Sequence, residues 1–293
     1  NFVYSLYYML KIGISVVNYG ILPDVEFLKD VAIKSEQYAL DSLWVSEHII
    51  VPKDDKPWTR VFEGISLLSL FAGLTEKILL GTSVLVLPLR NPIIVGKQLA
   101  SLDILSNGRL LLGLGLGWNK SEFEILKKDF LNRSNTIKDS VKLLRQLWSG
   151  DFEKSGFISE PLPIQKNGPP ILFGGQSVPA LQRVASIGDG WHPVGISSTE
   201  YEEKMKMIKQ INDRKYLWTL RLGFCANKFL SPNYIGTDGS PRLRLVGSSD
   251  QIISEIEKYR KIGLEHIALD IRVVTKVEYF EQIKIISQIK SVF

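Results

Sequence analysis

The feature that most constrains this sequence is a regular alternation between two kinds of segment. Short runs rich in leucine and β-branched residues alternate with longer stretches whose apolar residues recur at helical spacing. The eight predicted strands cover residues 11–17, 42–46, 77–87, 109–115, 169–175, 188–194, 216–227 and 266–271. Helices are predicted over 24–39, 62–74, 92–105, a region that reaches Trp148, 178–187, 250–262 and 276–291. This alternation favours a parallel sheet, and eight such units in 293 residues favour a (β/α)8 TIM barrel of the α/β class.

The chain is interpreted as one domain, because its composition shows no break along the sequence. Residues 1–10 are interpreted as an N-terminal extension and residues 11–293 as the barrel domain. Two connections, 149–169 and 227–248, are rich in Gly, Pro, Ser and Asn and exceed the usual length of ~2–6 residues. They are the predicted insertions in the loops between strands and helices, and one of them is a candidate lid.

Composition argues against several classes of function. The net charge of +5 comes from scattered lysines and arginines, whereas a nucleic-acid surface needs clustered ones. No window approaches the ~18 apolar residues of a membrane span. Cys225 is the only cysteine, which predicts no disulfide framework and favours a reducing, cytoplasmic location. The histidines form no H-x-H pair, so we expect no metal site. A small-molecule substrate is the expected partner.

Alternating glycines end the fourth predicted strand, in the run GRLLLGLGLGWNKSEFE over 108–124. A dinucleotide-binding fingerprint has the spacing G-x-G-x-x-G, whereas Gly113, Gly115 and Gly117 are two residues apart. The strand is also the fourth of the chain rather than the first. Two interpretations stay open. Glycines at the carboxyl end of a barrel strand let a flat ligand lie against the backbone, or they ease packing in the barrel.

An ordered set of motifs between Leu40 and Asp270 resembles one known family. The motifs are LDSLWVSEH, SVLVLPLRNPIIVGKQLASLDILSNGRLLLGLGLGWNKSEF, PPILFGGQS, GDGWHP and LVGSSDQIISEIEKYRKIGLEHIALD. Together they are similar to the luciferase-like monooxygenase superfamily and, more narrowly, to its coenzyme F420-dependent oxidoreductase branch. The resemblance implies a TIM-like barrel that binds one flavin or deazaflavin at the C-terminal ends of its strands. It also implies hydride transfer to or from the cofactor ring, and a homodimer.

Two alternatives to a deazaflavin-dependent oxidoreductase remain. One is an FMN-dependent two-component monooxygenase, which activates oxygen and is supplied by a separate flavin reductase. The other is a non-catalytic flavin-binding barrel, which kept the fold but lost turnover.

The resemblance also assigns roles to an acid–histidine pair after the second strand. Glu47 corresponds to an acid near the cofactor, and His48 to a histidine that faces the substrate. An imidazole with an ordinary pKa of ~6.5 can give or take the proton that accompanies hydride transfer. His48 is therefore the predicted acid/base, and Glu47 is expected to hydrogen-bond either the cofactor or His48.

Three backbone segments are the predicted cofactor contacts. The resemblance places a bulge with a non-prolyl cis peptide behind the cofactor ring, at Ser83–Val84. The turn Gly174, Gly175, Gln176 and Ser177 ends a strand and opens a helix, where backbone N–H groups can bind an anion such as the phosphate-bearing tail. The third segment is Gly115, Leu116 and Gly117.

Aromatic residues near strand ends suggest the substrate pocket. Trp44, Trp118, Trp191 and His192 are the candidates, although core packing explains such residues equally well. His266 opens the eighth strand, at the end of the barrel that usually serves stability. Sugar-phosphate dehydrogenases of this superfamily carry an acid where this chain has Trp118, so we expect a bulkier and less polar substrate.

Overall fold

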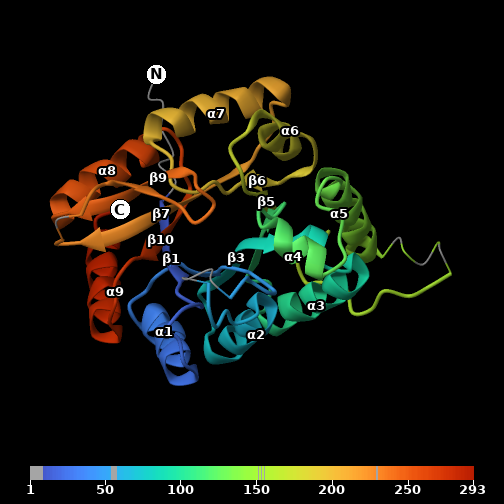
Figure 1. Ribbon diagram of the computed structural model, residues 1–293, viewed down its shortest axis with the longest axis horizontal. Helices are drawn as coiled ribbons and strands as arrows, with labels where there is room; N and C mark the ends of the chain where they lie inside the picture. Colours follow the sequence, from blue (N-terminus) through green and yellow to red (C-terminus); the bar gives the residue numbers. More distant parts are fainter. Residues whose placement is uncertain (1–8, 54–57, 151, 153, 155, 229) are drawn as a thin grey trace, which may run out of the picture.

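The computed structural model describes residues 9–53, 58–150, 152, 154, 156–228 and 230–293, and it confirms the predicted TIM barrel (Figure 1). Neighbouring barrel strands are parallel, and the barrel closes because β10 pairs with both β1 and β7. The barrel strands are β1 (Lys11–Val16), β2 (Ser42–Val45), β3 (Leu79–Val86), β4 (Leu110–Gly115), β5 (Ile171–Phe173), β6 (Gly190–Trp191), β7 (Leu217–Ala226) and β10 (His266–Ile271).

Helices surround these strands as a ring (Figure 1). They are α1 (Val25–Gln37), α2 (Gly64–Leu74), α3 (Pro92–Leu105), α5 (Arg133–Ser149), α6 (Val178–Ile187), α7 (Ser198–Ile211), α8 (Ser249–Lys261) and α9 (Lys276–Lys290). A 3-10 turn, η1 (Leu87–Leu89), follows β3, and the short α4 (Lys120–Ile125) lies inside the ring.

Helix α7 is the one element of this ring that the sequence pattern does not predict. Its segment is dominated by Lys and Glu, and only Tyr201, Met205 and Ile208 are buried. The helix begins with a capping box, in which the Ser197 and Glu200 side chains each bond the other residue's backbone N–H. This local signal, rather than a broad apolar face, marks where α7 begins.

The connection 227–248 contains a β-hairpin instead of an irregular loop. Its strands are β8 (Asn233–Ile235) and β9 (Pro241–Gly247), which pair antiparallel with each other. Strand β9 also pairs in parallel with residues 223–226 at the end of β7, past the short β6. The backbone N–H of Leu243 donates to the carbonyl of Gly195, 2.8 Å away, so the hairpin is fixed to the loop after β6 as well.

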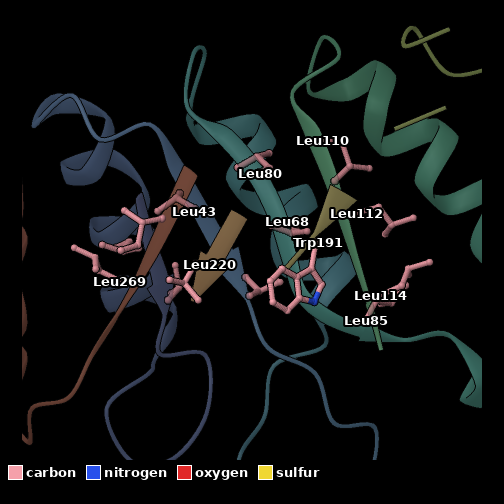
Figure 2. Close-up of a cluster of buried hydrophobic side chains, with 14 of the residues drawn as sticks. Leu43, Leu68, Leu80, Leu85, Leu110, Leu112, Leu114, Trp191, Leu220 and Leu269 are labelled. Carbon is pink, nitrogen blue, oxygen red and sulfur yellow. The ribbon is translucent and has the colours of Figure 1, made fainter. Parts of the chain in front are cut away.

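Two apolar layers follow from the alternation of side chains along each strand. The larger layer lies between strands and helices, and Figure 2 shows part of it, including Leu43, Leu80, Leu112 and Leu269 from four strands. The smaller layer fills the barrel interior and contains Trp44, Leu111, Leu172 and Ala268.

Glycines make room at close contacts inside the barrel. A Cβ atom at Gly113 would lie 2.0 Å from the carbonyl oxygen of Thr82, and one at Gly115 would lie 2.4 Å from Val84 Cγ2. These neighbours belong to β3, whose register with β4 shifts between Thr82 and Leu85. Two of the alternating glycines are therefore required by the packing of the β3 bulge, which favours the packing interpretation for them.

The first eight residues of the expected extension lie outside the described part of the chain. Of its remaining two, Met9 is exposed and Leu10 is buried in the core before β1. Among the described residues, every helix is too short or too polar to cross a lipid bilayer.

We predict that Gly113→Ala destabilises the fold by about 1–3 kcal/mol, because its methyl group overpacks against a backbone atom that cannot move freely. Gly73→Ala is the control: that glycine lies in α2, and apart from its chain neighbours and its own helix backbone no atom of the described chain lies within 4 Å of an added Cβ. There, alanine should stabilise by up to about 1 kcal/mol through helix propensity. Urea unfolding measures both, and equal effects would contradict the role assigned to Gly113.

Candidate functional site

A cavity of about 760 Å³ opens at the C-terminal ends of the barrel strands. It is bounded by the ends of β2 to β6, by the loop after β6 and by the β8–β9 hairpin. Thirteen of the fifteen residues predicted for the site line it: Glu47, His48, Ser83, Val84, Gly115, Leu116, Gly117, Trp118, Gly174, Gly175, Gln176, Ser177 and His192. Its volume falls in the range of ~300–1,000 Å³ that is typical of small-molecule sites.

Trp44 and Trp191 do not line the cavity, contrary to the expectation for substrate-pocket residues. The Trp44 ring lies in the barrel interior and stacks on His192, with centroids 4.5 Å apart. Trp191 belongs to the outer layer and packs against Tyr201 of α7, at 4.8 Å. Its Nε1–H donates to the carbonyl oxygen of Gly175 at 2.8 Å, so Trp191 supports the glycine turn from behind.

His48 contacts two tryptophan rings and one carboxylate. The ring centroids of Trp58 and Trp118 are 4.5 Å and 5.7 Å from the imidazole centroid. His48 Nδ1 is 3.0 Å from Glu122 Oε2, and both side chains are buried. The histidine that the sequence singles out is thus held at the cavity wall by aromatic contacts and by a hydrogen bond with Glu122.

Glu47 does not bond His48, one of its two expected partners. Its Oε2 accepts the backbone N–H of Val86 at 2.5 Å, and its Oε1 accepts from Arg90 Nη2. Arg90 also donates to Glu63, which caps α2. His48 bonds Glu122 instead, so Glu47 fixes the turn after β3, and the predicted bond from Glu47 to His48 is absent among the described contacts.

Glu122 is a site residue that sequence reasoning missed. Burial raises its pKa, but the hydrogen bonds from His48 and from the backbone N–H groups of Ile49 and Ile50 outweigh burial and hold that pKa below its ordinary value. The pattern N-x-x-E, from Asn119 to Glu122, resembles a helix-capping signal. No local signal indicates that this acid reaches a histidine 74 residues away.

His192 is a neutral, structural part of the cavity floor. Burial and the positive charge of Arg221 lower the pKa of His192 to about 3. The Thr219 hydroxyl donates to the Trp191 carbonyl, so it must accept from His192 Nδ1–H, 2.6 Å away. His192 Nε2 is therefore unprotonated and accepts from the Ser83 hydroxyl at 2.8 Å.

Arg221 crosses the barrel beneath the cavity. Its Nη1 donates to the Ser46 hydroxyl and to the Ser83 carbonyl, each at 2.9 Å, and its Nη2 donates to Asp270 at the same distance. Burial lowers the pKa of Arg221, but Asp270 outweighs this effect and raises it. The predicted cis peptide is confirmed at Ser83–Val84.

The outer end of the cavity has the features of an anion site. Gly175 has φ +90°, and Gln176 Nε2 donates to the Val194 carbonyl at 2.7 Å, which shapes the turn before α6. Ser177 is the N-cap residue, as predicted, although its side chain makes no cap hydrogen bond within the described chain. Arg183 also lines this end, and its buried Nε has no partner among the described residues.

Other lining residues were also missed by sequence reasoning. Trp58 lies in a loop without periodicity, and Arg183 sits in a helical pattern that predicts only a solvated face. The hairpin residues Asp238 and Arg242, which pair at 2.9 Å, come from a segment with loop-like composition. Each reaches the cavity only through the tertiary fold.

A closed parallel barrel with this cavity at its strand ends, a bulged β3 and a glycine turn before α6 defines a TIM-barrel protein with a small-molecule site at the strand ends. The family model for luciferase-like monooxygenases matches residues 8–216, which is more than half of the chain. The chain therefore belongs to the luciferase-like monooxygenase family.

Individual relatives bind different cofactors. An F420-dependent glucose-6-phosphate dehydrogenase from Amycolatopsis mediterranei (strain U-32) is 32% identical over 152 residues, which cover 49% of this chain and 43% of that protein. The match thus spans less than half of that relative's length. A structure of an F420-dependent secondary alcohol dehydrogenase with an F420–acetone adduct superposes with TM-score 0.77 at 17% identity, covering 96% of this chain and 98% of the other.

A third relative carries a different cofactor. The oxygenating constituent of 3,6-diketocamphane monooxygenase from Pseudomonas putida, in complex with FMN, gives a TM-score of 0.76 at 12% identity. The superposition covers 96% of this chain and 97% of the other. At such low identities the two structural matches show a shared fold and leave the cofactor of this chain open.

The buried histidines predict a specific dependence of stability on pH. Burial and nearby charges lower the pKa of both His192 and His266 to about 3, whereas an unfolded histidine titrates near ~6.5. Below pH 6.5 the unfolded chain binds protons that the folded chain does not. The free energy of unfolding should therefore be highest above pH 6.5 and fall toward pH 5 by up to about 1.4 kcal/mol per pH unit for each histidine.

Urea unfolding between pH 7.5 and 5 measures this slope. A His192→Asn variant removes one of the two groups, so its slope should be smaller than that of the parent by up to about 1.4 kcal/mol per pH unit, whatever its absolute stability. An unchanged slope would show that His192 titrates normally in the folded protein.

Proposed function

We propose that this protein is an F420-dependent oxidoreductase that transfers a hydride between the deazaflavin and a small organic substrate. The observation that carries the proposal is the placement of His48 at the wall of the cavity, beside the β3 bulge and the glycine segments that the family uses for its cofactor. The F420-dependent relative supports the choice of cofactor.

The residues of the cavity fit a deazaflavin. Gly115, which the packing of β3 also requires, lies with Gly117 and the Ser83–Val84 segment in a wall of small side chains, against which a flat ring can lie. At the outer end, the turn before α6 and the partly unsatisfied Arg183 suit an anionic tail. When bound, the deazaflavin supplies a two-electron hydride donor or acceptor.

His48 would handle the proton of the reaction. When an alcohol is oxidised, its hydroxyl proton needs an acceptor near neutral pH, and an imidazole nitrogen at the cavity wall provides one. In the reverse direction the imidazolium returns the proton to the carbonyl oxygen.

The walls around His48 favour an apolar or aromatic substrate. Trp118 is 41% exposed and lines the cavity, and it stands where the resemblance places an acid in sugar-phosphate dehydrogenases. Trp58 also contacts the imidazole, with ring centroids 4.5 Å apart. Two indole rings offer dispersion contacts but only weak recognition of several hydroxyl groups. A secondary alcohol or ketone with an apolar substituent fits better than a sugar phosphate.

A titration of the purified protein with coenzyme F420 and, separately, with FMN tests the cofactor. Saturable binding of F420 alone is the expected result. Preferred binding of FMN would instead identify an oxygen-activating monooxygenase that needs a separate reductase. Tight F420 binding without hydride exchange would indicate a non-catalytic barrel.

The same titration tests the anion site. Gly175→Ala places a Cβ at a residue with φ +90° and 3.0 Å from the Ala180 Cβ, so the turn must shift and F420 binding should weaken by about tenfold or more. Gly263→Ala is the matched control, with φ +96° in the loop before β10, at the opposite end of the barrel. Equal F420 affinity in both variants would place the anion site elsewhere.

For His48→Ala we expect turnover to fall by about 10²–10⁴-fold while F420 affinity stays within a few-fold, because the side chain acts on the proton rather than on cofactor binding. F420 reduction by propan-2-ol and by 1-phenylethanol, followed by absorbance, measures turnover, and glucose 6-phosphate is the comparison substrate. Undiminished turnover would remove His48 from the catalytic residues.

The expected homodimer and cytoplasmic location remain proposals. The resemblance alone supports the dimer, and the single buried cysteine is compatible with a reducing compartment. Sedimentation velocity would show whether the chain is a dimer, and a monomer at micromolar concentration would contradict that expectation.

A further inference from the structure

We propose that Glu122 is the positioning residue of His48, holding the imidazole proton on Nδ1 and leaving Nε2 bare toward the cavity. This inference rests on the proposed function, because it assigns the partner of the same histidine. It adds a residue from a different element, α4, to a site whose other parts lie at strand ends.

The hydrogen bonds of Glu122 leave one arrangement of protons. Its Oε1 accepts the backbone N–H groups of Ile49, at 2.5 Å, and Ile50, at 3.2 Å. Its Oε2 is then the oxygen that meets His48 Nδ1, at 3.0 Å. An ionised carboxylate only accepts hydrogen bonds, so Nδ1 must carry the proton and donate it.

The ionised form of Glu122 is well supported. Its side chain is 2% exposed, and an ion so deeply buried needs several hydrogen bonds to compensate for lost water. The three donors supply them, and all three belong to the consecutive residues 48–50. One carboxylate therefore holds both the imidazole and the backbone that follows it.

The remaining contacts of His48 fix the ring plane but not the proton. Trp58 and Trp118 lie at 59° and 82° to the imidazole, and both contacts are insensitive to which nitrogen is protonated. Nδ1 and Nε2 point away from each other across the ring. With Nδ1 bound to Glu122, Nε2 is the nitrogen that a cavity ligand can reach.

A purely structural role for Glu122 is the competing interpretation. In that case its bonds to Ile49 and Ile50 would merely hold the loop, and the His48 proton would be free to sit on either nitrogen. Glu122→Gln separates the two roles. The amide oxygen can still accept from Ile49 and Ile50, but the NH2 group then faces His48 and donates to Nδ1, which forces the proton onto Nε2.

Nitrogen NMR of the cofactor-free protein, labelled with ¹⁵N-histidine and recorded at pH 8.5, tests the inference without any turnover. The chain has three histidines, so the spectrum is simple, and a His48→Asn sample assigns the signal of His48. We expect a protonated Nδ1 and a bare Nε2 for His48 in the parent protein, and the reversed pattern in Glu122→Gln. His192, with its own fixed Nδ1–H, is the internal reference.

Glu124→Gln is the matched control. That carboxylate lies in the same helix, is exposed and pairs with Lys120 rather than with the site. It should leave the His48 signals and the turnover of propan-2-ol or 1-phenylethanol unchanged. Glu122→Gln should lower turnover by about 100-fold or more while F420 affinity stays within a few-fold.

The outcomes separate this inference from the proposed function. A parent protein in which His48 carries its proton on Nε2 overturns the inference, even if Glu122→Gln fails to fold. Unchanged His48 signals in a folded Glu122→Gln variant overturn it as well. Failure of F420 to bind would overturn the proposed function and leave the NMR result standing.

Discussion

A buried guanidinium joins opposite sides of this barrel, and the cavity is built on top of it. Arg221 on β7 donates one hydrogen bond to Asp270 on β10. It donates two more, to the Ser46 hydroxyl after β2 and to the Ser83 carbonyl on β3. A buried cation is tolerated only when it is paired and its donors are used. That requirement fixes strands from opposite sides of the barrel relative to each other. The positions of these strands in turn determine where the residues of the cavity floor lie.

The inner and outer ends of the cavity differ in chemistry because different elements supply them. Strand ends contribute the inner end, where His48 is enclosed by Trp58 and Trp118 and the neutral His192 forms the floor. The turn before α6 and the hairpin contribute the outer end, where Arg183 lies. A ligand with a flat ring and a charged tail matches this division. The proposed function depends on that match together with the placement of His48 at the cavity wall.

Much of the fold and part of the site could be predicted from the sequence, for identifiable physical reasons. Strands such as β4 and helices such as α3 are encoded locally, by apolar periodicity and by the Asn91–Pro92 start signal. Helix α7 and the β8–β9 hairpin escaped prediction because their segments are mostly polar and find their apolar contacts only in the folded protein.

The side-chain contacts of the site were harder to predict than its location. Trp44 was expected in the pocket, but β2 turns its ring into the barrel, where Gly81 leaves space for it. Glu47 was expected to bond either the cofactor or His48, but the side chains of these neighbouring residues diverge, and the partner of His48 is Glu122 on α4. Motifs locate strand ends along the chain, whereas pairings between distant elements require three-dimensional geometry.

The two indole rings beside His48 give the protein a built-in optical reporter. Trp58 and Trp118 line the cavity, whereas Trp44, Trp148, Trp191 and Trp218 are buried elsewhere in the core. Indole fluorescence responds to the polarity around the ring and to nearby absorbing rings. A ligand at the inner end of the cavity should therefore change the fluorescence of these two tryptophans more than that of the other four. The state of the site can therefore be followed in the unlabelled chain.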